Sequence, residues 1–148
     1  LIRTTLFSAG GLSVPVMEAV LEAGDSSMTY RSRYLASVQL APVLDLLLSD
    51  ETNPRSLAYQ LAALVDHVEN LPRDRTQPLR SPDQRIALAA LHAVRMMTMA
   101  DLGELPVQGR PTRLSRLLGM LAERLPRLSD LICHRYLIHA GVPKQMDE

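Results

Sequence analysis

Residues 53–72 read Asn-Pro-Arg-Ser-Leu-Ala-Tyr-Gln-Leu-Ala-Ala-Leu-Val-Asp-His-Val-Glu-Asn-Leu-Pro, and this stretch decides the fold class. An asparagine followed by a proline is typical of a helix start, because the asparagine caps the first turn and proline fits the first helical position. Apolar residues then recur three and four positions apart, which places them on one helical face. They are Leu57, Leu61, Leu64, Val65, Val68 and Leu71. Since Pro72 ends the pattern, the stretch predicts an amphipathic helix with one buried side.

The rest of the chain carries the same helical signals. The sequence Ser-Pro-Asp-Gln at 81–84 forms a capping box, and the helix that it opens is predicted to run to about Leu102. Thr112 caps a further helix, which Pro126 is expected to break or kink before a last helical stretch to about Ala140. The first third of the chain predicts three shorter helices, over residues 13–24, from 25 or 26 to about 37, and 41–48.

The patterns argue against a sheet. No segment alternates apolar and polar residues over the length of a strand, and aromatic residues make up only 3% of the chain. The linkers over residues 73–80 and 103–111 are short, so the helices that they join should pack antiparallel. We therefore predict an all-α fold, a bundle of about six to seven mostly antiparallel helices. We expect residues 1–148 to form a single all-α domain.

The composition excludes several classes of protein. Basic and acidic residues both number 16, so the net charge is zero and nucleic-acid binding is not expected. No apolar run approaches the ~18 residues that cross a membrane, so a membrane partner is not expected either. A single cysteine excludes a disulfide framework. Because the first residues do not form a signal peptide, we expect a cytoplasmic location.

The chain shows no recognisable catalytic, metal or cofactor motif. His134 and His139 would point about 140° apart on one helix, so they cannot share an ion. No glycine pattern matches a phosphate-binding loop, so no nucleotide or other cofactor is expected. Cys133 and the methionine cluster at 96–99 are interpreted as core residues, with a partner-binding groove as the alternative for the methionines.

One stretch is polar where a core face is expected. On a helix over residues 25–34, Tyr30 and Tyr34 stack one turn apart, and Arg31 falls on the inward stripe, where it needs a carboxylate partner. Two interpretations stay open: a buried ion-pair network that sets helix register, or a site for an anion or a peptide carboxylate. We expect Arg31 and Asp45 to be structural, whereas Arg33 and Arg55 are candidates for an anionic ligand. The candidate residues are Tyr30, Arg31, Arg33, Tyr34, Asp45 and Arg55.

The same residues carry a resemblance to a known family. Residues 25–35 read Asp-Ser-Ser-Met-Thr-Tyr-Arg-Ser-Arg-Tyr-Leu, residues 40–48 read Leu-Ala-Pro-Val-Leu-Asp-Leu-Leu-Leu, and residues 50–57 read Asp-Glu-Thr-Asn-Pro-Arg-Ser-Leu. With Gln60 and Leu61, this block resembles the signature of the bacterial alpha-E domain. The Arg-Tyr-Leu sequence at 135–137 is similar to the closing helix of that family.

The resemblance implies an all-helical domain encoded beside, or fused to, circularly permuted ATP-grasp ligases and transglutaminase-like proteins. It therefore implies an accessory or interaction module of peptide amide-bond synthesis or modification, with one of those proteins as its partner. The alternative is part of an enzyme acting on peptide amide bonds, completed by helices that precede this segment. We expect this chain to be the C-terminal portion of a larger alpha-E domain or fusion protein. Apolar surface left bare by the missing helices predicts possible self-association.

The acidic–arginine pairs for which the family is named lie mainly in its N-terminal helices. Glu123-Arg124 falls in a later helix and is not equated with those pairs.

Overall fold

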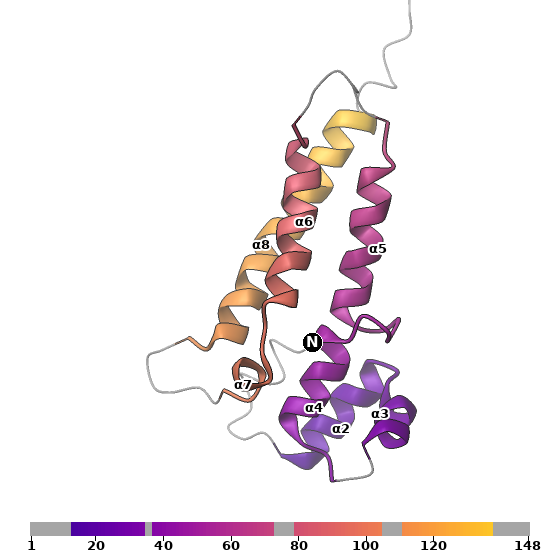
Figure 1. Cartoon of the computed structure of the whole chain (residues 1–148), viewed down its shortest axis with the longest axis vertical. Coiled ribbons are helices and arrows are strands. Elements are labelled where there is room, and N and C mark those ends of the chain that lie inside the picture. The colour runs from indigo at the N-terminus through magenta and orange to yellow at the C-terminus, as the bar shows by residue number, and fades with distance from the viewer. Residues whose placement is uncertain (1–12, 35–36, 73–78, 105–110, 138–148) are drawn as a thin grey trace, which may run out of the picture.

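The computed structural model describes residues 13–34, 37–72, 79–104 and 111–137 of the chain. Within these ranges every regular element is helical, which confirms the all-α prediction. Two groups of helices are visible in Figure 1: a long layer of α5, α6 and α8, and a shorter lobe of α2, α3 and α4 below it.

The long layer contains the three longest helices, α5 (Leu57–Glu69), α6 (Pro82–Arg95) and α8 (Arg113–Ile132). Successive helices of the layer run antiparallel, as predicted (Figure 1). α6 packs against both α5 and α8, which approach each other less closely. Their buried faces share one core, made of Ala58, Leu61, Val65, Val68, Ala87, Ala90, Leu91, Val94, Leu117, Leu121 and Leu128.

Side-chain contacts hold the C-terminal end of α8 against the neighbouring ends of α5 and α6. The helix continues as the wider turn η2 (Cys133–Leu137), the closing segment of the resemblance. The Arg135 guanidinium donates to the buried Asp83 carboxylate at 3.1 Å, and the Tyr136 hydroxyl donates to the Pro72 carbonyl at 2.9 Å. These contacts tie α8 to the start of α6 and to the end of the α5 segment.

The shorter lobe contains α2 (Val14–Ala23), α3 (Ser27–Arg33) and α4 (Leu40–Leu44), which passes directly into the π-helical turn η1 (Asp45–Ser49). The α4–η1 helix is buried on nearly all sides, as expected for a helix that separates two cores. One side contacts α2 and α3 through Val43, Leu46 and Leu47. Leu44 and Leu48 face the other way, toward the short helix α7 (Met99–Leu102) and the start of α8. This helix therefore joins the lobe to the layer.

Two predicted helix ends were wrong. The helix predicted to continue from Ser81 to Leu102 stops at Arg95, because Thr98 and Asp101 form a second capping box that opens α7. The helix predicted to reach about residue 37 stops at Arg33, and Tyr34 has extended backbone angles.

A predicted helix start was also wrong, and of the break or kink predicted at Pro126 the break does not occur. α5 begins at Leu57 with Ser56 as its cap, so Asn53 has another role. Pro126 lies inside α8 and does not break it. Leu121 and Leu128, on either side of the proline, both stay in the core, and this packing offsets the lost backbone hydrogen bond.

Two interpretations of sulfur-containing side chains were wrong as well. Cys133 is exposed rather than buried. Met96 and Met99 are about half exposed, and of the cluster only Met97 packs against the core. The break between α6 and α7 accounts for the methionines, because it removes them from the face of a continuous helix.

Candidate functional site

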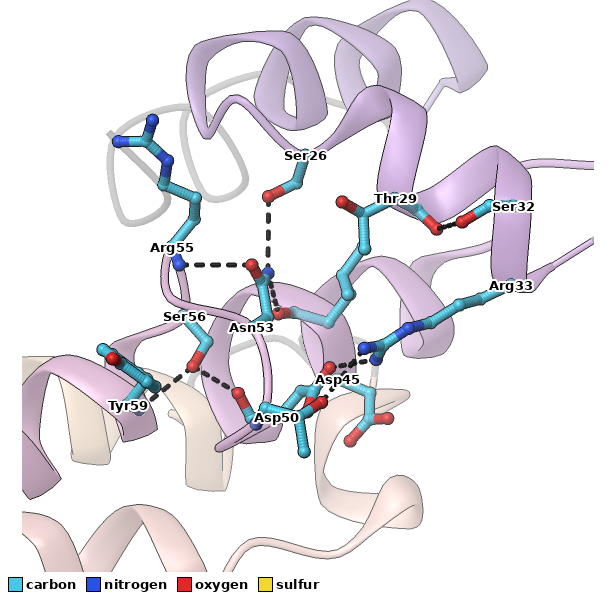
Figure 2. Close-up of polar contacts among 12 residues, drawn as sticks. Ser26, Thr29, Ser32, Arg33, Asp45, Asp50, Asn53, Arg55, Ser56 and Tyr59 are labelled. Carbon is cyan, nitrogen blue, oxygen red and sulfur yellow. Dashed lines mark hydrogen bonds and ion pairs between the residues drawn. The ribbon is translucent and has the colours of Figure 1, made fainter.

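The polar cluster forms around the loop that follows η1. The Arg33 guanidinium forms an ion pair with Asp50 and donates to the Thr52 hydroxyl at 3.0 Å (Figure 2). Asp50 also accepts hydrogen bonds from the Thr52 amide and hydroxyl. Burial alone would raise the pKa of the Asp50 carboxyl, but these donors and the arginine charge outweigh it, so its pKa lies below the ordinary value. Arg33 thus binds an anion supplied by its own chain.

Asp45 has the opposite electrostatic character. Desolvation, followed by the nearby negative charge of Asp50, raises the pKa of its carboxyl. The Tyr34 hydroxyl lies 3.5 Å from this carboxylate, and burial together with the Asp45 charge raises the pKa of the tyrosine. The stacking of Tyr34 on Tyr30 is confirmed, with ring centroids 4.9 Å apart. Tyr30 is buried, and its hydroxyl accepts from the Gln39 amide at 3.1 Å.

The three candidate arginines do not converge. Arg55 forms an ion pair with Asp25 at 2.6 Å, with both side chains well exposed. Figure 2 places the Arg33 and Arg55 side chains on opposite sides of Asn53. The prediction that Arg31 faces inward was wrong: it is exposed and forms no ion pair with a described residue. The reason is that α3 is a single short helix whose buried residue is Tyr30, so the inward stripe does not extend to its neighbour.

A buried polar network at the centre of the cluster was missed in the sequence. The Asn53 side-chain amide donates to the Leu46 carbonyl at 2.9 Å and to the Ser26 hydroxyl at 3.4 Å, and its oxygen accepts from the Arg55 amide (Figure 2). The Ser56 hydroxyl donates to the Asp50 carbonyl and accepts from the Tyr59 amide. Ser26, Asn53 and Ser56 are all buried. The sequence signal for this network was that these three small polar residues all lie in the block that resembles the alpha-E signature. Asn53 and Ser56 follow shortly after the run of leucines at 46–48.

A second ion pair holds the same loop against the long layer. The Arg95 guanidinium donates twice to the Glu51 carboxylate, at 2.6 and 2.8 Å. The hydrogen bond from Arg95 holds the pKa of the Glu51 carboxyl below its ordinary value. The loop from Asp50 to Ser56 is therefore anchored to α3 on one side and to the end of α6 on the other.

An apolar cleft of about 460 Å³ lies where the lobe meets the layer. α2, η1, α5 and α8 all contribute to its walls, which contain Val20, Gly24, Leu47, Leu48, Arg55, Ser56, Leu57, Gln60, Leu118 and Ala122. Arg55 is the one charged residue among them, and its side chain is 61% exposed. The arrangement can hold an apolar group with an anionic group beside it.

The described residues show neither a metal cluster nor a membrane helix. Within the four described ranges, no group of histidine, cysteine and acidic side chains is arranged to hold an ion. In the same part of the chain, no helix combines the length and apolarity needed to cross a bilayer. Glu123 and Arg124 are both exposed on α8, apart from the polar cluster.

Comparison with known proteins gives the same family as the sequence signature. Residues 1–137 match the Alpha-E family, described as a predicted alpha-helical domain with a conserved ER motif. Uncharacterized proteins of Mycobacterium bovis and Mycobacterium tuberculosis are 31% identical over 128 residues, which cover 85% of this chain. The chain spans only 14% of the length of these relatives. No solved structure matches the chain. The chain belongs to the Alpha-E family.

Proposed function

We propose that this domain is an accessory docking module of a bacterial ATP-grasp-linked system that makes or modifies peptide amide bonds. The observation that carries the proposal is the apolar cleft between α2, η1, α5 and α8, with Arg55 on its wall. We propose that it receives a segment of the ligase in which apolar side chains stand beside a carboxylate.

The chemistry of Arg55 supports this occupant. Its partner Asp25 is 74% exposed, and an ion pair between exposed side chains contributes only about 0–1 kcal/mol. An incoming carboxylate could therefore replace Asp25 at little cost, while the apolar side chains next to it fill the cleft. Arg33 is a poorer candidate because Asp50 and Thr52 already occupy its guanidinium.

The relatives are consistent with a module. Their matching region is a small part of a much longer chain, as expected for a domain that works beside others. The link to ATP-grasp or transglutaminase-like partners rests on the family resemblance, and the proposed cytoplasmic location rests on the single cysteine, which excludes a disulfide framework.

Light scattering on the chain, alone and mixed with the ATP-grasp protein of the same organism, tests the proposal. We expect a stable complex that Ala122→Arg abolishes, because the new side chain fills the cleft. Ala100→Arg, at an exposed position outside the cleft, is the matched control. Arg55→Gln should weaken the complex, and Asp25→Asn should strengthen it by releasing Arg55. A self-associated species that ignores the ligase would contradict the proposal.

One observation favours the alternative, an enzyme acting on peptide amide bonds. Burial and the charge of Asp50 raise the pKa of the Asp45 carboxyl, which lies 3.5 Å from the Tyr34 hydroxyl, so Asp45 is the residue to which this alternative would assign proton transfer. If Asp45 has this role, Asp45→Asn should abolish turnover by the assembled system and leave the complex intact. If turnover is unchanged, the enzymatic alternative loses the support that the described residues give it.

A further inference from the structure

A second pocket, separate from the apolar cleft, lies between α2 and α3 in the shorter lobe. It has a volume of about 350 Å³. The two helices are packed against each other (Figure 1). The lining residues are Glu18, Leu21, Glu22, Ser27, Tyr30, Arg31 and Val38. Nothing in the proposed docking function uses this pocket.

The charges of this pocket are divided between its walls. Glu18 and Glu22 are one turn apart on α2, so both carboxylates lie on the same side. Arg31 lines the pocket from α3. No ion pair within the described residues joins Arg31 to either glutamate, so the opposite charges line a shared space without direct contact.

The floor of the pocket is apolar. Leu21 is 3% exposed and Tyr30 is 2% exposed, so both are held rigidly in the core of the lobe. The Tyr30 hydroxyl accepts a hydrogen bond from the Gln39 backbone amide, which holds the tyrosine in place beside the pocket. Val38 adds an aliphatic surface.

We propose that this pocket binds a zwitterion with an aliphatic side chain, such as a free α-amino acid or a very short peptide. Glu18 and Glu22 receive the ammonium group, Arg31 and the Ser27 hydroxyl receive the carboxylate, and Leu21, Tyr30 and Val38 contact the side chain. The opposite charges at the two ends of the ligand must meet the opposite charges on the two walls, because charge-assisted hydrogen bonds at both ends fix the ligand in one orientation. The proposal is independent of the apolar cleft, whose residues are different.

Titration of the whole chain by nuclear magnetic resonance and calorimetry tests the proposal. The probes are L-leucine and leucyl-leucine at millimolar concentration, and whichever binds more tightly identifies the ligand length. N-acetyl-leucine lacks the ammonium group and leucinamide lacks the carboxylate, so each should bind about tenfold or more weakly than leucine. Signals from α2 and α3 should shift, and those from α8 should not.

Two variants test the recognition of the two ends of the ligand independently. Arg31→Gln should weaken leucine binding about tenfold or more and leave leucinamide binding unchanged. Glu22→Gln should weaken leucinamide binding and leave N-acetyl-leucine binding unchanged. Arg85→Gln, at an exposed position on α6, is the matched control. Because Arg31 and Glu22 are exposed, both variants should fold normally, which circular dichroism would verify. Absence of binding by both probes, or equal binding by the Arg31 and Arg85 variants, would overturn the proposal.

Discussion

The Asn53 side-chain amide donates a hydrogen bond to the main-chain carbonyl of Leu46, 2.9 Å away, inside the protein. The two residues belong to the loop before α5 and to the π-helical turn η1. A wide turn leaves carbonyl groups without their usual helical donors, and a buried carbonyl without a donor is costly. Asn53 therefore does more than start a helix: it secures the segment that joins the lobe to the layer.

Replacing Asn53 with alanine should destabilise the protein by about 2–3 kcal/mol, because the buried Leu46 carbonyl loses its side-chain donor. Asn70→Ala is the matched control, since Asn70 makes a similar 2.9 Å hydrogen bond to a carbonyl at an exposed position. Its loss should cost well under about 1 kcal/mol. Urea unfolding of both variants measures the difference, and equal losses would contradict the role assigned to Asn53.

Gly24 is required because α2 approaches η1 too closely for a side chain. A Cβ atom at Gly24 would lie 2.8 Å from Leu47 Cδ2 and 3.2 Å from the Val20 carbonyl oxygen. Since Leu47 is buried and cannot move freely, Gly24→Ala should destabilise the protein by about 1–3 kcal/mol in thermal or urea unfolding.

Gly119 provides the opposite control for the same substitution. It lies inside α8, where an added Cβ meets nothing within 4 Å. Gly119→Ala should therefore stabilise the protein by about 0.5–1 kcal/mol through helix propensity alone. Loss of stability at Gly119, or no loss at Gly24, would show that the packing around these glycines is different.

The ion pair between Arg135 of η2 and Asp83 should contribute more to the stability of the fold than the arginine contacts of α8. Asp83 is 3% exposed, and removal of its guanidinium partner leaves a buried carboxylate uncompensated. Arg135→Gln should cost about 1–3 kcal/mol, less than for a fully buried pair because the arginine is partly exposed. Arg127→Gln, at an exposed position on the preceding helix α8, should be nearly neutral in the same unfolding assay. Equal effects of the two substitutions would exclude a special role for Arg135.

Asp45 and Asp50 should affect stability in opposite directions as the pH changes. The fold lowers the pKa of Asp50, so its charged form stabilises the fold above the ordinary value of about 3.9 and loses this effect below it. The fold raises the pKa of Asp45, so its charged form opposes folding at neutral pH. This penalty disappears as the pH falls through the folded-state pKa toward about 3.9.

Unfolding of two variants at neutral and acidic pH checks these signs. Asp50→Asn should destabilise the protein at pH ~7, and Asp45→Asn should stabilise it, each by no more than about 1 kcal/mol because neither carboxylate is fully buried. Both differences should shrink near pH ~4. A stabilising Asp50→Asn, or an Asp45→Asn effect that grows with acidification, would reverse the assignment.

Most of the fold could be predicted because helix signals are local. The capping box at Ser81 and the cap at Thr112 both form as predicted, since a cap depends only on residues within one turn. Two errors came from local caps that were overlooked, at Ser56 and Thr98, whereas at Pro126 a distant contact decided the outcome. α8 passes through Pro126 because the flanking leucines stay in a core made with α5 and α6.

The candidate site was only partly predictable. The Tyr30–Tyr34 stack follows from a spacing of four residues and was confirmed. The partners of Arg33 and Arg55, which are 17 and 30 residues away, do not follow from any local pattern. Arg31 was misplaced because a periodic stripe describes a long helix better than a helix of seven residues.

The sequence by itself determined the all-α class, the order of the main helices and the family, because these depend on caps, periodicity and a local signature. The tertiary structure alone decided which charges meet, which polar groups are buried around Asn53, and where the cleft and the zwitterion pocket open. The physical reason is the distance along the chain over which each kind of interaction acts. Capping and helical periodicity act within a turn or two, whereas burial and ion pairing depend on segments that only packing brings together.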